Sequence, residues 1–110
     1  MAKGEFLGEF EQVVLLALVR LTPEAYGMKI RQEIEDRTGR KVSIGAVYAT
    51  LDRLEQKGLV ASEMTEPRAE RGGRGRRLYR IELAGRQALA RSQEVIHKLL
   101  EGLEPLVEAP

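Results

Sequence analysis

Two neighbouring stretches of the chain decide its fold: SIGAVYATLDRLEQKGLV at residues 43–60 and RGGRGRRLYRIEL at residues 71–83. In the first stretch, apolar residues recur at the spacing of a single helix face, which predicts a helix with one stripe packed on a core. The stripe consists of Ile44, Val47, Leu51 and Leu54. In the second stretch, arginines and glycines precede an alternating apolar pattern, which predicts a cationic loop that leads into a β-strand.

We expect the opposite face of the first helix to be the one that meets a partner. It is predicted to carry small side chains near its start and basic side chains further along: Ala46, Ala49, Thr50, Arg53 and Lys57. This layout is typical of a helix that enters the major groove of DNA, with Thr50 and Arg53 contacting base edges. An ordinary solvated helix face is the alternative.

The arginine-rich stretch is predicted to be the tip of a β-hairpin. Between Glu66 and Arg77 the chain has five arginines against two glutamates, with three interleaved glycines. Glycine allows close backbone approach, and guanidinium groups pair with phosphate oxygens, so Arg74, Arg76 and Arg77 are candidate DNA contacts. Strands are predicted at residues 59–65 and 76–83, the second with Tyr79, Ile81 and Leu83 on one face. A disordered solubilising loop is the alternative for the tip.

Two more helices are predicted before these stretches. Residues 9–21 are apolar enough to be buried on most sides. Thr22 is then expected to cap a second helix over about residues 23–38, with Pro23 in its first position and Gly39 at its end. Ser43 is expected to cap the third helix. This order of helices and hairpin predicts a mainly α fold with a small β-hairpin, a winged helix-turn-helix.

The chain is expected to end in a dimerisation helix over about residues 85–104. Apolar residues follow a seven-residue spacing along it, which favours a partner helix over packing on its own domain. The expected dimer interface comprises Leu89, Ile96, Leu99, Leu100 and Leu103, with Phe6 and Phe10 as a second wall. Ser92 interrupts the seam, and Pro105 should end or kink the helix. We therefore divide the chain into a DNA-binding part, residues 1–83, and a dimerisation helix, residues 84–110.

Composition narrows the function classes. The net charge is +1, but residues 1–40, 41–80 and 81–110 carry −1, +4 and −2, so the positive charge is concentrated on the predicted third helix and hairpin. The 110 residues include no cysteine and a single histidine, His97, to which we assign no metal. We see no catalytic motif, cofactor motif, membrane span or signal peptide, and we expect a cytoplasmic protein that is not an enzyme.

Three segments together resemble the PadR family of bacterial transcriptional regulators. They are YGMKIRQEIEDRTG at 26–39, SIGAVYATLDRLEQKGLVAS at 43–62 and GRGRRLYRIELAGRQAL at 73–89. The resemblance implies a homodimeric winged-helix repressor that places its third helix in a major groove of double-stranded DNA and its wing alongside. The single helix after the wing is similar to that of the shorter PadR subfamily, in which it pairs with the partner's terminal helices.

The resemblance adds Tyr26, Lys29, Ser43 and Tyr48 to the expected DNA-binding residues, with core packing as the alternative for both tyrosines. The chain departs from the family at residues 46–49, where Ala-Val-Tyr-Ala replaces the usual Thr-Leu-Tyr-Pro. It also lacks the tryptophan that stacks on flat drug molecules in the dimer cavity of some family members. A small apolar effector that binds at the dimer seam is still expected as an option. Two functions compete with DNA binding: a winged-helix module that binds a protein, and a winged helix that binds RNA.

Overall fold

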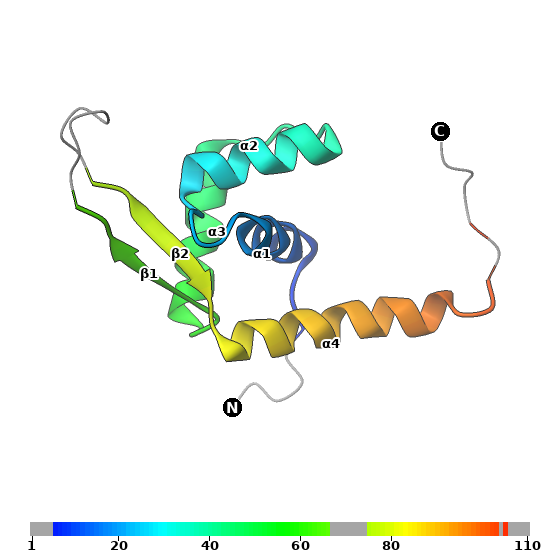
Figure 1. Cartoon of the computed structure of the whole chain (residues 1–110). Helices are drawn as coiled ribbons and strands as arrows, with labels where there is room; N and C mark the ends of the chain where they lie inside the picture. The colour runs from blue at the N-terminus through cyan, green and yellow to red at the C-terminus, as the bar shows by residue number, and fades with distance from the viewer. Residues whose placement is uncertain (1–5, 67–74, 104, 106–110) are drawn as a thin grey trace.

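The computed structural model describes residues 6–66, 75–103 and 105. It contains three helices, α1 (Glu9–Leu21), α2 (Gly27–Thr38) and α3 (Ile44–Gln56), then the strands β1 (Val60–Met64) and β2 (Arg77–Ile81), and finally α4 (Leu83–Leu100). Figure 1 shows α1 between α2, α3 and the base of the hairpin, with α4 extending away from the hairpin beneath them. The mainly helical winged fold predicted from the sequence is confirmed.

The core forms where α1, α2, α3 and the hairpin meet. Burying apolar side chains from all four elements stabilises their arrangement. Its largest fully buried side chains are Val14, Leu15 and Leu18 of α1, Ile30 of α2, and Val47, Leu51 and Leu54 of α3. Tyr79 of β2 is 3% exposed and closes the core on the hairpin side.

The start of α2 differs from the prediction. Thr22 does not cap α2, because its N–H and its Oγ1 both donate to Leu18 O, each at 3.0 Å, and so finish α1 instead. Residues 23–26 precede the helix: Tyr79 N–H donates to Ala25 O at 2.8 Å, and Tyr26 forms an isolated antiparallel bridge with Leu78. This pairing with β2 keeps Tyr26 extended, with φ −114° and ψ 161°, so α2 begins only at Gly27.

The other predicted helix boundaries near the turn are confirmed. Gly39 ends α2 with a left-handed φ of 74°, a conformation that glycine adopts without strain. Ser43 precedes α3, and its Oγ accepts a hydrogen bond from Ala46 N–H at 3.0 Å. These two stop and start signals fix the short turn that orients α3 against α2.

The hairpin is antiparallel and pairs Val60 with Ile81 at its base and Met64 with Arg77 at its outer end. Tyr79 points into the core, but Leu83, which was predicted to share its face, does not. Leu83 is instead the first residue of α4 and is 70% exposed, because the strand ends at Ile81. The wing is therefore real but shorter than the sequence pattern indicates.

Helix α4 begins on the hairpin and ends earlier than predicted. A Cβ at Gly85 would lie 2.2 Å from Leu59 O, so only glycine allows this contact between α4 and the residue that precedes β1. The helix stops at Leu100, and Gly102 follows with φ 80°. Leu103 consequently lies beyond the helix and not in its seam.

Candidate nucleic-acid interface

The outward face of α3 is rotated relative to the prediction. Thr50 was expected on the outer surface, but it is 2% exposed and packs beside Val47, Leu51 and Leu54. Its hydroxyl accepts a hydrogen bond from Arg53 Nη2 at 3.4 Å, which satisfies the buried oxygen. The assignment of Thr50 as a base contact on the outer surface is therefore wrong, because its side chain is buried.

The exposed face of α3 centres on residues that the sequence analysis missed. Successive positions spaced by four, three and four residues lie opposite the buried stripe and form what we call the outer line of α3. It consists of Gly45, Ala49, Asp52 and Gln56, all exposed. Only Ala49 was predicted; Ala46 is also exposed, to one side of the line. Once Thr50 is placed in the buried stripe with Val47, Leu51 and Leu54, helix geometry brings the other three residues onto the outer face.

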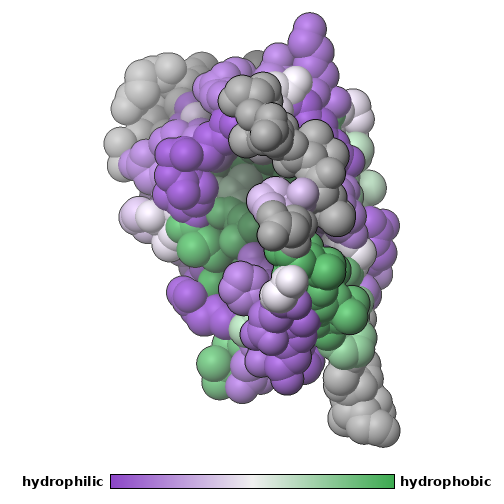
Figure 2. All heavy atoms as spheres, turned by 90° about the vertical axis from the view of Figure 1, so that its right-hand side faces the viewer, coloured by the Kyte–Doolittle hydropathy of each residue, from purple (hydrophilic) through white to green (hydrophobic). Residues whose placement is uncertain are grey.

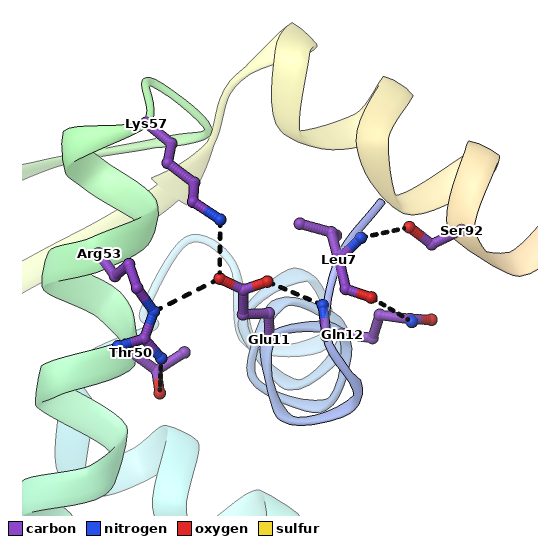
Figure 3. A network of polar contacts seen from close by, with 8 residues as sticks. Leu7, Glu11, Gln12, Thr50, Arg53, Lys57 and Ser92 are labelled. Carbon is purple, nitrogen blue, oxygen red and sulfur yellow. Dashed lines mark hydrogen bonds and ion pairs between the residues drawn. The ribbon is translucent and has the colours of Figure 1, made fainter. Parts of the chain in front are cut away.

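Arg53 and Lys57 lie on the flank of α3 that faces α1. Both approach one carboxylate oxygen, Glu11 Oε2, Lys57 Nζ at 3.1 Å and Arg53 Nε at 3.5 Å, as Figure 3 shows. The other oxygen of Glu11 accepts a hydrogen bond from Gly8 N–H at 2.9 Å at the start of α1. A glutamate of α1 thus holds the two basic side chains that were predicted to face DNA.

Glu11 is almost buried, with 8% of its surface exposed. Burial raises the pKa of its carboxyl, but the hydrogen bond from Gly8 and the adjacent Lys57 and Arg53 outweigh burial and leave the pKa below its usual value. The carboxylate is therefore ionised at neutral pH and compensates positive charge on this flank. No sequence motif marks the contact, which joins positions 46 apart along the chain.

The opposite flank of α3 borders an open groove of ≈ 480 Å³ between α2, α3 and the hairpin, which we call the tyrosine groove. Its lining residues are Tyr26, Met28, Tyr48, Gly75, Arg76 and Arg77. Tyr48 is 39% exposed, and its ring lies against Gly27, where a Cβ would come within 2.6 Å of three ring and hydroxyl atoms. Glycine at the start of α2 thus makes room for the tyrosine of α3.

The arginines at the outer end of the described hairpin, Arg76 and Arg77, contact neutral groups. The Arg76 guanidinium lies over the Tyr26 ring at 4.1 Å from its centroid, a cation–π contact. Arg76 is also fixed through its backbone, since its N–H donates to Thr65 Oγ1 and its carbonyl accepts from Thr65 N–H. Arg77 Nη1 donates to Ser62 Oγ at 3.0 Å. Neither contact cancels the charge of the arginine.

Three further predicted DNA contacts differ in how the structure places them. Lys29 extends from α2 and pairs with Glu24 at 3.4 Å in an exposed salt bridge. Ser43 is exposed, although its hydroxyl already accepts the hydrogen bond that caps α3. Arg74, with the glycines and arginines of the wing tip at residues 67–74, lies outside the described residues.

The predicted dimer interface is divided between buried and exposed residues. Leu89 is 9% exposed and belongs to the chain's own core, and Phe10 is half-buried beneath the Arg40 guanidinium, so neither lies in an open seam. Leu89, which we expected in the dimer interface, is instead buried by its own chain. Ser92 is buried as well, because its Oγ accepts from Leu7 N–H at 2.8 Å and so ties α4 to the start of α1 (Figure 3).

Beyond Ser92, no described residue buries the apolar side chains of α4 and of Leu103, which follows it. Val95, Ile96, Leu99, Leu100 and Leu103 are between 41% and 72% exposed, and Phe6 is 57% exposed. Val95 was not predicted. Figure 2, which looks onto the side from which α4 points outward, shows apolar surface in the middle of this face with hydrophilic borders. Within the described residues no helix has the length and apolar character of a membrane span, and no group of side chains could hold a metal ion.

Comparisons with known proteins agree with this geometry. Residues 15–91 match the model of the Transcriptional regulator PadR-like family. The chain is similar to the transcriptional regulator Rv3488 of Mycobacterium tuberculosis, with 41% identity over 76 residues that cover 69% of this chain and 66%, just under two thirds, of that protein.

Two solved structures have the same fold. A PadR family transcriptional regulator from Eggerthella lenta superimposes with a TM-score of 0.69 and 29% identity, covering 93% of this chain and 88% of that chain. The winged-helix DNA-binding protein F93 from STIV superimposes with a TM-score of 0.70 over 91% of this chain and 100% of that chain. At 17% identity the second likeness concerns the fold alone. By its sequence match and its architecture, the chain belongs to the PadR-like family of transcriptional regulators, which are DNA-binding proteins and not enzymes.

Proposed function

We propose that this regulator is a homodimeric repressor that binds an inverted repeat in double-stranded DNA. The observation that carries the proposal is the outer line of α3, which stands between the tyrosine groove on one flank and Arg53 with Lys57 on the other. Small residues on an exposed helix between two basic borders suit a major groove between two phosphate strands. In this proposal residues 1–83 bind DNA and residues 84–110 hold the dimer together.

The tyrosine groove would bind one phosphate strand. Arg76 and Arg77 supply the positive charge, and the hydroxyls of Tyr26 and Tyr48 can donate to phosphate oxygens from rings that are already packed. In this proposal Lys29 would contact the same strand. Ala46 and Ala49 allow the backbone of α3 to approach the bases, and Arg53 and Lys57 would face the other strand.

The exposed half of α4 supports the homodimer. Five apolar side chains in one patch exceed what a soluble monomer usually leaves in water. The same chain offers an apolar groove of ≈ 140 Å³ between α1 and α2, lined by Val13, Leu16, Ala17 and Ile34 among others. A two-fold dimer in which each α4 covers the partner's α1 would bury both surfaces at once.

The dimer would set the spacing of the half-sites. Two copies of α3 related by a two-fold axis match an inverted repeat with half-sites about one helical turn apart. A small apolar effector bound at the α4 seam would change that spacing and release DNA. Repression in the cytoplasm follows if the inverted repeat overlaps a promoter.

Enrichment of genomic fragments with the purified protein, followed by footprinting and sedimentation, tests the proposal. We expect a short inverted repeat, protection on both half-sites and a dimer in solution. Repression predicts that deleting the gene raises transcription beside the enriched sites. An asymmetric single half-site, or no enriched sequence, would contradict the proposal and favour a protein-interaction module.

A further inference from the structure

The centre of the outer line of α3 carries a carboxylate. Asp52 is exposed and follows the small residues Gly45 and Ala49 along the same line. Its carboxylate has no hydrogen-bond or salt-bridge partner among the described residues, although Arg53 is its neighbour in sequence. The Arg53 side chain turns to Glu11, on the flank toward α1.

The neighbouring carboxylate on α3 is placed differently. Glu55 Oε2 accepts a hydrogen bond from Ser62 Oγ at 2.9 Å, so Glu55 faces β1 and the wing. Asp52 therefore lies between two flanks of α3. On the flank toward α1 the basic side chains pair with Glu11, and on the flank toward the wing Glu55 pairs with Ser62. The flanks hold the cations that suit phosphate, and Asp52 occupies the line that would face the floor of the groove.

Charge and reach decide what Asp52 can bind there. A carboxylate is repelled by phosphate, and it accepts hydrogen bonds but cannot donate them when ionised. The donors on the floor of the major groove are exocyclic amino groups, and carboxylates pair with the N4 amino group of cytosine. An aspartate side chain is short, so the contact requires close approach of α3. Apart from its chain neighbours and its own helix backbone, no atom of the described residues lies within 4 Å of the position that a Cβ of Gly45 would occupy, and Ala49 adds only a methyl group, so the approach is open.

We propose that Asp52 is a specificity-determining residue that accepts a hydrogen bond from the amino group of one cytosine in each half-site. This assignment rests on the proposed function, in which α3 lies in the major groove. It explains why an acidic residue can stand at the centre of a surface whose borders are basic: it selects one base pair and disfavours sequences that offer only acceptors at that position.

The test compares base preference in matched variants. The preferred sequence of the wild-type protein is selected from random DNA, and affinities are then measured for that sequence and for every single base-pair replacement. We expect replacement of one C·G pair in each half-site to weaken wild-type binding roughly 10- to 100-fold. Asp52→Ala should lose this discrimination at that position alone, and Asp52→Asn should shift it toward adenine.

Glu55→Gln is the matched control, since it removes the same charge from the same helix and should leave base preference unchanged. If Asp52→Ala raises affinity for all sequences equally and keeps every preference, Asp52 acts only through its charge and the assignment is wrong. The assignment is equally overturned if Glu55→Gln loses the same discrimination. A wild-type protein that selects no sequence would instead overturn the proposed function, and this assignment with it.

Discussion

The two flanks of α3 both carry a pair of cations, but they differ in what holds them. Toward the wing, Arg76 lies on the Tyr26 ring and Arg77 on the Ser62 hydroxyl, and among the described residues neither arginine forms a salt bridge with a carboxylate. Toward α1, Arg53 and Lys57 share the Glu11 carboxylate, which cancels part of their charge. The wing flank is thus available to phosphate, whereas the α1 flank must exchange one anion for another. Summed charge along the sequence does not reveal this difference.

We expect the largest effect from breaking the dimer, because one copy of α3, with both of its flanks, is then lost from the complex with DNA. Ile96→Glu places a charge in the exposed patch of α4 and should yield monomers, because a buried interface does not tolerate an unpaired carboxylate. Loss of the second half-site should lower operator affinity on the order of 100-fold or more. Sedimentation and DNA titration measure both. Gln93→Glu, an exposed position on the same helix, is the control, and an Ile96→Glu protein that stays dimeric would rule out this interface.

The next effect tests the wing flank. Replacing Arg76 and Arg77 by alanine should weaken binding to specific and random DNA alike, on the order of tenfold, and reduce the salt slope by about two because two phosphate contacts are lost. Arg86→Ala with Arg91→Ala removes the same charge from exposed positions of α4 and should change the slope little. An unchanged slope in the wing variant would show that these arginines do not contact phosphate.

A third variant tests the α1 flank, and here we expect a smaller effect that raises DNA affinity instead of lowering it. Glu11→Gln removes the anion that holds Arg53 and Lys57, so affinity for random DNA should rise several-fold and the salt slope should steepen. The free energy of unfolding should fall by about 1 kcal/mol because charge-assisted hydrogen bonds are weakened. Glu9→Gln, which breaks only the exposed pair with Arg40, serves as the control. Equal affinities for both variants would mean that Glu11 does not restrain the flank.

We expect the smallest effect on how the free energy of unfolding changes with pH. The pKa of Glu11 is lowered from its usual value of 4.5 on folding, so its ionisation stabilises the chain above that pH and the stabilisation is lost as pH falls through the lower folded value. Thermal unfolding of wild type and Glu11→Gln should therefore differ most above about pH 4.5 and converge in stronger acid. A difference that stays constant down to pH 2 would contradict the lowered pKa.

The sequence predicted the parts of the fold that depend on local signals. Apolar spacing, the Ser43 cap and the Gly39 stop locate the helices, and the arginine-rich hairpin follows from alternation. The start of α2 could not be found in this way, because Thr22 and Pro23 satisfy a helix start locally while bridge formation between Tyr26 and the distant Leu78 decides the outcome. Tertiary pairing overrides local propensity there.

The candidate site was only partly predictable for a similar reason. Tyr26, Tyr48, Arg76 and Arg77 were named, and they do meet in one groove. Thr50 was misplaced, because a threonine can bury its methyl group when its hydroxyl finds a nearby donor. The pairing of Glu11 with Lys57 and the burial of Leu89 depend on how α1, α3 and α4 pack, which no periodicity in one helix specifies.

The contact between Gly85 and Leu59 fixes the start of α4 at the base of the wing. The carbonyl of Leu59 also accepts a hydrogen bond from Glu82 N–H at 2.9 Å, so α4 follows the base of the wing directly, without a flexible linker. A helix of 18 residues is about 27 Å long, and a rotation of about 5° at its base moves its far end by roughly 2 Å. Because the Leu7–Ser92 hydrogen bond also ties α4 to the start of α1, a change of tilt beside the wing would have to move α1 with it, and it would displace the far end of α4 most.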